Sequence, residues 1–318
     1  MDTGSMRLNV RGPGPAALSA LIATVLALGA IALMVARHGV ATGTPVAEGD
    51  ASGHYAQPEA EGDAASKALL AAVRTGPPAA PAPQDARAAL SARTDPLPAS
   101  EPLEASAIKP SPAVGPLFYT GQGAPGHGCT ASVVHSPRGD LVLTAAHCVH
   151  QDGFRTDIAF APGYRDGEAP YGVWVPTSVD IDPEWAADRD PDHDVAFLRV
   201  RRVGDSTPIE RVTGAEKLGL KPAVRRAARL IGYPADRDTP VACQNATDSH
   251  SPTQLRFDCR GLTNGTSGGP MLTDVDPATG LGTVAGVVGG YQEGGDDETS
   301  YSAYFGDNVA ALYKRATS

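Results

Sequence analysis

The feature that most constrains the fold is a succession of short apolar runs after residue 117, each bounded by Gly, Pro or Asp. Runs of about four to eight residues rich in β-branched side chains indicate the strands of an all-β sandwich or barrel. With 36 Gly and 28 Pro in 318 residues, the chain is also too interrupted for a helical bundle. We predict strands at eight places: 129–135, 140–144, 172–175, 195–200, 228–232, 255–259, 283–289 and 301–304.

One helix is expected, at the C-terminal end of the chain. The segment 307–315 starts with Asp and Asn residues that can cap a helix, and it spaces its apolar side chains on one face. It ends in Lys314 and Arg315, whose positive charges suit a helix C-terminus. Residues 117–318 are therefore predicted to form an all-β domain with a terminal helix.

The N-terminal part contains an uncharged run of 21 residues at 16–36. As a helix it would span about 30 Å, the thickness of a bilayer core, whereas a signal peptide has an apolar centre of about 7 to 15 residues. The length favours a membrane anchor over a cleaved signal peptide, while the small residues Gly39 and Ala41 keep cleavage open. Under both interpretations residues 1–41 direct the chain out of the cytoplasm, and the remainder is membrane-anchored or secreted.

Residues 42–116 are rich in Ala, Pro, Gly and acidic residues, and Tyr55 is their only aromatic residue. Proline removes hydrogen-bond donors and restricts its neighbours, and few large apolar side chains are present to build a core. Two helix-competent stretches, 64–74 and 85–93, are too short to be stable alone in water. We expect a linker here, with a removable pro-segment as the alternative.

The charge and cysteine content restrict the partners and the compartment. The net charge of −10 leaves no basic face, which argues against a nucleic-acid partner. All four cysteines lie between Cys129 and Cys259 without a Cys-x-x-Cys pair, which disfavours a zinc ribbon and favours two disulfides. Disulfides in turn indicate an oxidising compartment.

Two segments carry a histidine and a carboxylate that could act together. His147 ends the segment Leu-Thr-Ala-Ala-His-Cys directly after a predicted strand. Asp194 immediately precedes the apolar run Val-Ala-Phe-Leu, where a carboxylate can accept the Nδ1 proton of a histidine and fix its tautomer. Each has an ordinary alternative, a packed histidine in the first case and a solvated acidic loop in the second.

A third segment, 262–270, contains Gly-Thr-Ser-Gly-Gly-Pro around Ser267. A nucleophilic serine needs an exposed Oγ and nearby backbone N–H groups, and glycine leaves space for both. By itself the string could equally be an ordinary turn.

Taken together and in the order His147, Asp194, Ser267, the three segments resemble the chymotrypsin-like serine proteases, in particular bacterial trypsin-like and V8-like members, over residues 117–315. The family acid is followed by Val or Ile, Ala and an apolar pair, which selects Asp194 over Asp190 and Asp192. The resemblance implies two six-stranded antiparallel β-barrels with a C-terminal helix. It also implies a serine endopeptidase that acts through an acyl-enzyme and needs no metal or organic cofactor.

The resemblance assigns roles to individual residues. His147 becomes the general base, Asp194 its partner and Ser267 the nucleophile, with the amides of Gly265 and Ser267 as the oxyanion hole. Cys129 would pair with Cys148, and Cys243 with Cys259 to brace the nucleophile turn. The substrate-binding residues would be Gly261, Leu262, Asn264, Val288, Gly289, Gly290 and Tyr291.

Three departures from the family pattern affect activation and specificity. Thr266 stands where the trypsin branch has an Asp that pairs with a new N-terminal amine, so activation by that ion pair is not supported. Gly261 replaces the Asp that binds basic side chains, and Val288 or Gly289 replaces the His that receives Glu in the V8-like branch.

We therefore expect a preference for an apolar or small side chain before the scissile bond, because the pocket walls offer no fixed charge. The acidic loop 293–298 could instead attract Arg or Lys, although a solvated hairpin tip is the favoured interpretation.

Two rival functions remain at this point. One is a catalytically silent protease-like domain that binds an extracytoplasmic partner, and the other is a stalked structural β module with a chance motif. For the protease we expect a protein or peptide substrate, no nucleic-acid partner, a monomer, and membrane contact through residues 16–36 if that segment is uncleaved.

Overall fold

The computed structural model describes residues 45–76, 97–121 and 123–318. The expected membrane segment 16–36, the targeting region 1–41 and the helix-competent stretch 85–93 lie outside these residues. Among the described residues, no helix has the length and apolar character needed to cross a membrane.

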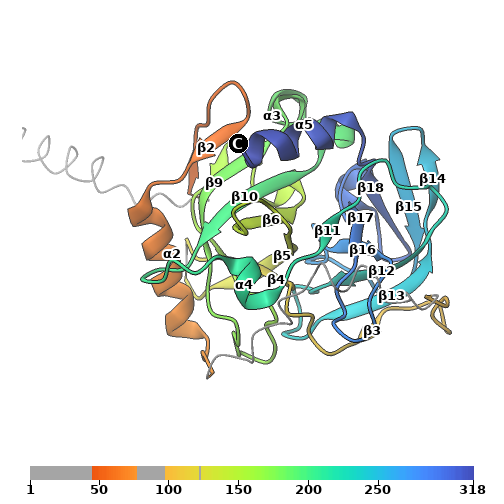
Figure 1. Ribbon diagram of the computed structural model, residues 1–318, viewed down its shortest axis with the longest axis horizontal. Helices are drawn as coiled ribbons and strands as arrows, with labels where there is room; N and C mark the ends of the chain where they lie inside the picture. Colours follow the sequence, from red (N-terminus) through yellow and green to blue (C-terminus); the bar gives the residue numbers. More distant parts are fainter. Residues whose placement is uncertain (1–44, 77–96, 122) are drawn as a thin grey trace, which may run out of the picture. The chain divides into compact units, whose positions relative to one another are not determined.

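The first half of the domain is built on a seven-stranded antiparallel sheet (Figure 1). In spatial order its strands are β2 (His54–Ala56), β9 (Val175–Ile181), β10 (Ala196–Arg201), β6 (Leu141–Thr144), β5 (Gly126–Val134), β4 (Val114–Tyr119) and β8 (Ile158–Phe160). A bridge between Phe160 and Trp174 joins β8 to the residue that precedes β9, so the sheet curls back on itself. The short strands β1 (Val46–Ala47) and β7 (Phe154–Arg155) pair separately beside it.

The second half combines a six-stranded and a three-stranded sheet. The first has the order β11 (Lys217–Leu218), β17 (Thr283–Val287), β16 (Pro270–Thr273), β12 (Ala227–Gly232), β13 (Val241–Ala246) and β3 (Ser106–Ala107). The second has the order β14 (Asp248–Ser251), β15 (Gln254–Asp258) and β18 (Thr299–Ala303). Side-chain hydrogen bonds connect the two sheets in two places. Asn245 Nδ2 of β13 donates to Asp258 O of β15 at 2.8 Å, and Val287 N of β17 donates to Ser302 Oγ of β18 at 3.0 Å.

The all-β class is confirmed, but the strand count differs from two six-stranded barrels. The additional strands β2 and β3 come from the N-terminal region that was expected to be a linker, and β11 comes from the connection between the two halves, where it pairs in parallel with β17.

Most predicted strands are present, and each strand that was not predicted is either only two or three residues long or contains prolines or polar residues. The run at 172–175 was placed too early, because the strand β9 begins at Val175 and continues to Ile181. Its Pro176 lies at a register shift opposite Val200, a position in a sheet that tolerates proline because no ladder donor is needed there. The strands that were not predicted are β4, β13, β14 and β16 and the two- or three-residue strands β1, β2, β3, β7, β8 and β11.

The C-terminal helix is confirmed as α5 (Asp307–Ala316), which buries Val309 and Leu312. Its N-cap is Gly306, and no side chain caps it. Helix α2 (Glu59–Ala72) covers most of the helix-competent stretch 64–74, which was expected to be too short to be stable alone. Helices α3 (Pro183–Asp188) and α4 (Ile209–Thr213) were not predicted. The 3-10 segments are η2 (Ala146–Cys148), η3 (Pro191–His193) and η4 (Tyr291–Gly294).

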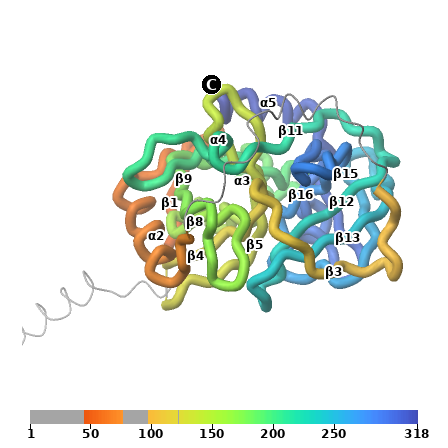
Figure 2. The backbone as a smooth tube through the Cα atoms, turned by 60° about the horizontal axis from the view of Figure 1, so that its bottom comes forward, coloured from red at the N-terminus to blue at the C-terminus, as the bar shows by residue number. Residues whose placement is uncertain are grey.

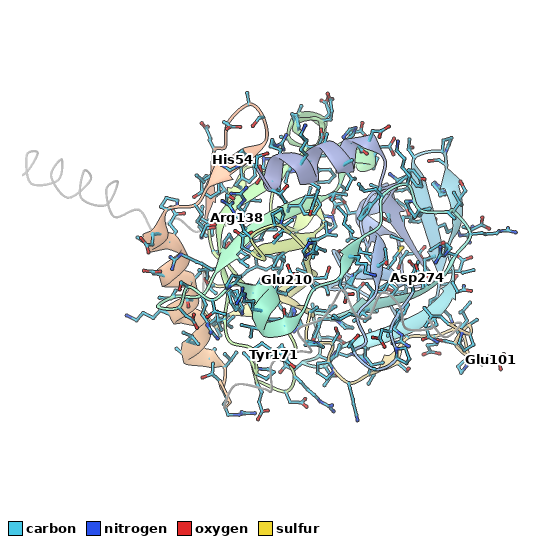
Figure 3. All side chains as sticks on the ribbon, in the orientation of Figure 1. His54, Glu101, Arg138, Tyr171, Glu210 and Asp274 are labelled. Atoms are coloured by element: carbon cyan, nitrogen blue, oxygen red, sulfur yellow. A yellow bond between two sulfur atoms is a disulfide. The ribbon has the colours of Figure 1, made fainter. Side chains whose placement is uncertain are left out.

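The described part of the region 42–116 is packed against the β domain, unlike the expected linker. Strand β2 pairs with β9, and Figure 2 shows α2 beside β8 and β9. The Tyr55 ring stacks on Phe154 at 5.5 Å between ring centroids. His54 lies on β2 (Figure 3), and its Nδ1 is 3.0 Å from Oδ1 of Asp180, which is also 3.5 Å from Nε of Arg315 on α5. The predicted boundary at residue 117 falls inside β4.

This packing can be tested with adjacent leucines on α2. Leu69 has no exposed surface, whereas Leu70 is 45% exposed. We expect Leu69→Ala to lower the free energy of unfolding of the whole domain by about 2 to 5 kcal/mol, because a cavity forms in its core. Leu70→Ala should change it little, as measured by denaturant unfolding. Equal small effects of the two substitutions would mean that α2 is not part of the cooperative unit.

A buried carboxyl group in the connection between the two halves gives a second test. Glu216 is fully buried, its Oε2 accepts from Gly282 N, and its Oε1 has no hydrogen-bond partner among the described residues. Burial raises the pKa of the Glu216 carboxyl from 4.5 to about 8, against a smaller opposing effect of the Gly282 hydrogen bond. Since the folded state holds the proton, this group stabilises the fold fully below pH 4.5 and loses its contribution as the pH rises through 8.

We therefore expect the free energy of unfolding of Glu216→Gln to exceed that of the wild type increasingly between pH 4.5 and 8, by up to roughly 5 kcal/mol. Glutamine keeps the acceptor for Gly282 and cannot ionise. Denaturant unfolding across this pH range measures the difference, with the exposed Glu298→Gln as a control that should follow the wild type. A constant difference between Glu216→Gln and wild type would contradict the buried, protonated carboxyl.

Candidate active site

His147 lies in the short segment η2 that follows strand β6. Its side chain is 8% exposed, and the indole of Trp185 from α3 lies 6.4 Å away between ring centroids. The next residue, Cys148, forms a disulfide with Cys129 on β5, which fixes the segment to the neighbouring strand. The second disulfide joins Cys243 and Cys259. These are the two pairs that the sequence predicts.

Asp194 is the acid that contacts His147. Its Oδ2 is 2.8 Å from His147 Nδ1, its Oδ1 accepts from the backbone N–H of His147 at 2.9 Å, and Oδ2 also accepts from Gly290 N at 2.8 Å. The side chain has no exposed surface. The alternatives have other contacts, since Asp190 accepts from the backbone of Asp192, and Asp192 accepts from Gln254.

The surroundings of His147 favour its protonated form. Burial alone lowers the pKa of the imidazole, but the Asp194 carboxylate and the hydrogen bond to it act in the opposite direction, with a further contribution from the charge of Glu293. The net result is a pKa raised above the usual value of 6.5. A histidine in this state is a stronger base than a free imidazole.

The Ser267 turn packs directly on the end of strand β6. Gly268 has a φ of 77°, and a Cβ atom there would clash with Thr144 Oγ1 and Thr130 O, two residues of the strands beside His147. Thr130 donates its N–H to Ser267 O at 2.7 Å and its hydroxyl to Gly265 O at 2.9 Å. These contacts place the half-buried Ser267 at the same end of β6 as His147.

The turn also presents backbone donors. Gly265 has a φ of 100°, which favours glycine. Among the described residues, no acceptor receives a hydrogen bond from the N–H of Gly265 or of Ser267. Thr266 is buried and donates its hydroxyl to Thr263 O at 2.9 Å, so local hydrogen bonds hold the turn where the trypsin branch uses an ion pair.

The expected substrate-binding residues differ in burial. Gly289 donates to Tyr301 O at 3.0 Å, and a Cβ atom on it would lie 2.9 Å from Asp194 Oδ2, so the missing side chain leaves room for the carboxylate. Leu262 and Val288, which were expected on the pocket walls, are each only 4% exposed.

The reason is that both side chains pack into an apolar cluster of the second half of the domain. Of the expected pocket residues, Asn264 and Tyr291 are exposed. The acidic loop 293–298 contacts the expected pocket at Gly261, whose N–H donates to Asp297 O at 2.9 Å.

One buried residue beside this site was missed by the sequence analysis. Gln254, the first residue of β15, is 4% exposed and contacts both the segment before Asp194 and Tyr291. No sequence signal distinguishes it, because a single Gln at the start of a predicted strand looks like any other polar strand residue.

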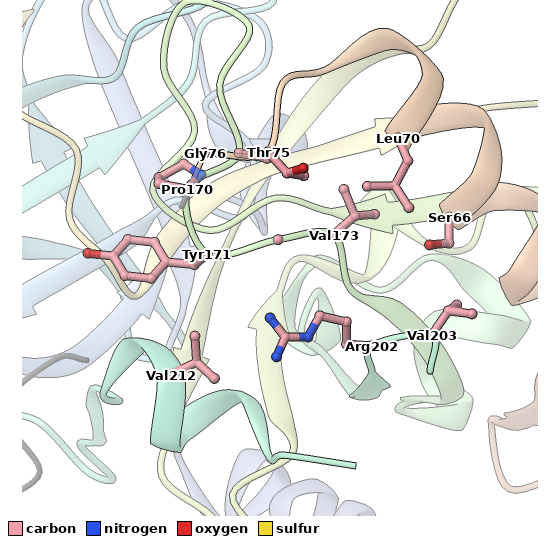
Figure 4. Close-up of a pocket in the computed structure, with 12 residues that line it drawn as sticks. Ser66, Leu70, Thr75, Gly76, Pro170, Tyr171, Val173, Arg202, Val203 and Val212 are labelled. Atoms are coloured by element: carbon pink, nitrogen blue, oxygen red, sulfur yellow. The ribbon is translucent and has the colours of Figure 1, made fainter. Parts of the chain in front are cut away.

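Two other features carry no chemistry that we can assign. His147 and the sulfurs of Cys129 and Cys148 lie within 4.8 Å of one another, but disulfide sulfurs are not the thiolates that bind metals. A cavity of about 350 Å³ lies beside α2, with Tyr171 and Arg202 on its wall (Figure 4). Its lining residues include no His, Cys, Asp or Glu, and none belongs to the candidate site.

Comparison with known proteins gives one family match. Residues 129–281 match the family described as trypsin-like peptidase domain. No curated protein matches the sequence.

Three similar solved structures are proteases. The protease Anisep from Arthrobacter nicotinovorans has 24% identity and a TM-score of 0.59 over 67% of this chain and 99% of that chain. The thermostable serine protease AL20 from an extremophilic microorganism has 27% identity and a TM-score of 0.57 over 65% and 97%. A Glu endopeptidase in complex with MPD has 17% identity and a TM-score of 0.52 over 67% and 96%.

Residues 129–281 thus match the trypsin-like peptidase family, and the chain shares its fold with chymotrypsin-like serine proteases. The match to a trypsin-like peptidase domain and the similar proteases support assignment of this protein to the serine peptidases, a class of hydrolases.

The electrostatic effect of Glu293 on His147 gives a prediction. Glu293 is exposed, and its charge contributes to the raised pKa of His147. We expect Glu293→Gln to lower the pKa of the His147 imidazole, measured by an NMR titration of its ring protons. Glu298→Gln in the same loop is the control and should leave that pKa unchanged. The same pKa in the Glu293 variant and in wild type would show that the charge does not reach the imidazole.

Proposed function

We propose that the protein is a serine endopeptidase in which His147, Asp194 and Ser267 act as a catalytic triad. The observation that carries the proposal is the buried Asp194–His147 pair at 2.8 Å, beside a glycine-rich turn that presents a serine and two N–H groups without an acceptor among the described residues. In such a triad the acid fixes the histidine tautomer and stabilises the imidazolium that forms during the reaction.

In this mechanism Nδ1 of His147 donates to Asp194, which leaves Nε2 free to take the proton of the Ser267 hydroxyl. Ser267 Oγ then attacks the carbonyl carbon of the peptide bond, and the N–H groups of Gly265 and Ser267 donate to the resulting oxyanion. His147 next protonates the leaving amine, and a water molecule, activated in the same way, hydrolyses the acyl-enzyme.

The backbone next to the site supports binding of an extended peptide. The carbonyl of Gly289 accepts no hydrogen bond from the described residues, so it can accept one from a substrate N–H. Since Thr266 and Thr130 hold the oxyanion turn by hydrogen bonds, we propose that activity does not require a new N-terminal amine. For the side chain before the scissile bond we propose a small or apolar preference.

The proposed setting is outside the cytoplasm. Two disulfides favour an oxidising compartment, and the apolar run 16–36 supports a membrane anchor or a signal peptide. We propose that the protease is anchored through this run or secreted, and that it acts as a monomer on protein substrates.

The first test combines a fluorophosphonate probe with chromogenic peptides that end in Arg, Glu, Leu or Ala. We expect the wild type to react with the probe at Ser267 and to cleave the Ala or Leu peptide best. Ser267→Ala should abolish labelling and lower the rate by about 10⁴-fold or more while the fold is retained, because the hydroxyl makes the bond.

Substantial turnover by the Ser267 variant would refute the assignment of the nucleophile. A wild type that reacts with neither probe nor peptide would favour a silent, partner-binding domain. Cleavage of the Arg peptide alone would refute the proposed preference and point to the acidic loop.

A second test separates Asp194 from its neighbour. Asp194→Asn should lower kcat by about 10⁴-fold, because an amide stabilises the wrong tautomer of His147. Asp192→Asn is the matched control and should have a small effect, since asparagine still offers an oxygen to Gln254. Steady-state kinetics of both variants decide the matter, and equal losses would reopen the identity of the acid.

A further inference from the structure

Gln254 uses its whole side-chain amide to join two segments of the candidate active site. Its Nε2 donates to Pro191 O at 2.9 Å and to Asp192 Oδ1 at 2.7 Å, and its Oε1 accepts from Tyr291 N at 3.0 Å. The first two acceptors belong to η3, which ends just before Asp194, and Tyr291 begins η4. A side chain from β15 thus connects the segment of the acid with the end of residues 288–291, which follow β17 and are here called the substrate strand.

The orientation of this amide follows from its partners. A peptide carbonyl and an ionised carboxylate can only accept hydrogen bonds, and the N–H of Tyr291 can only donate one. The Nε2 atom must therefore face Pro191 and Asp192, and the Oε1 atom must face Tyr291. A glutamate at this position would have the same shape but no N–H donor. Its ionised carboxylate would then face two other acceptors, Pro191 O and Asp192 Oδ1.

Asp194 and Gln254 form two parallel connections between the same segments. Asp194 accepts the N–H of Gly290, and Gln254 accepts the N–H of the next residue, Tyr291. Gly290 has a φ of 77°, and a Cβ atom there would clash with Gln254 Oε1. Gln254 is only 4% exposed, so losing these hydrogen bonds would leave its own amide buried without partners, which is costly.

From this geometry, and resting on the proposed function, we propose that Gln254 is a positioning residue for the triad. It holds the Pro191–Asp192 backbone, and with it Asp194, at a fixed distance from Gly290 and Tyr291. The orientation of His147 and the shape of the substrate strand therefore depend on the same amide. Gln254 itself touches no substrate and takes no part in proton transfer.

Three variants test this, all measured in the full-length protein. Gln254→Glu keeps the shape and removes the donor, and Gln254→Met removes both polar functions. Gln57→Glu is the matched control, because Gln57 is also buried, at 7% exposed, and donates to a backbone carbonyl, that of Thr156, without touching the candidate site. Rates are normalised to the folded fraction of each preparation, determined by near-UV circular dichroism.

We expect both Gln254 variants to lower kcat/KM for peptides by about 10- to 100-fold at neutral pH, since small misplacements of catalytic groups have effects of this size. For Gln254→Glu alone, activity relative to wild type should recover as the pH falls, because a protonated carboxyl can donate one hydrogen bond. The low-field NMR signal of the His147 Nδ1 proton should shift in the Gln254 variants and stay unchanged in Gln57→Glu.

Wild-type kcat/KM and an unshifted Nδ1 proton in both Gln254 variants would overturn the proposal. So would an equal loss in Gln57→Glu, which would show a general effect of a buried charge. If one Gln254 variant fails to fold, the other decides between these outcomes. Failure of the proposed function has a different signature, because the wild type itself would then neither cleave peptides nor react with a fluorophosphonate.

Discussion

The arrangement of the site depends on the hydrogen bonds that the buried Asp194 carboxylate accepts. A carboxylate without solvent contact is costly unless hydrogen bonds compensate the lost hydration. Here the backbone and the ring of His147 supply two of them, and Gly290 of the second half of the domain supplies the third. The two halves therefore meet around one negative charge, and the same charge orients the imidazole.

Two glycines and a disulfide bring other chain segments close to Asp194 and His147. Glycine at 268 and 289 lets the nucleophile turn and the substrate strand approach Thr144 and Asp194 without side chains between them. The disulfide from Cys129 to Cys148 fixes the residue after His147 to strand β5. Preorganisation of this kind is the main contribution of a protein to acyl transfer, because the donors need not reorganise when charge develops.

The sequence predicted what depends on local patterns. Strands β5, β6, β10, β12, β15, β17 and β18 and helix α5 were recognisable from short apolar runs and helical spacing, and the motifs around His147, Asp194 and Ser267 indicated the site. The N-terminal region was misjudged because its stability comes from distant partners. Leu69 and Tyr55 are buried by residues more than a hundred positions further along the chain as well as by nearer ones, and composition does not reveal such pairing. Gln254 was missed for the same reason, since its role depends on two segments that only the fold brings together.

The central claim is that Ser267 forms a covalent acyl-enzyme with help from His147. The most direct measurement is mass spectrometry after acid quenching of a reaction with an activated ester substrate, followed by peptide mapping. We expect one acyl group per protein on the peptide that contains Ser267, and its loss on longer incubation as the intermediate is hydrolysed. An acyl group on another residue, or ester turnover without any covalent species under conditions where deacylation is slow, would contradict it.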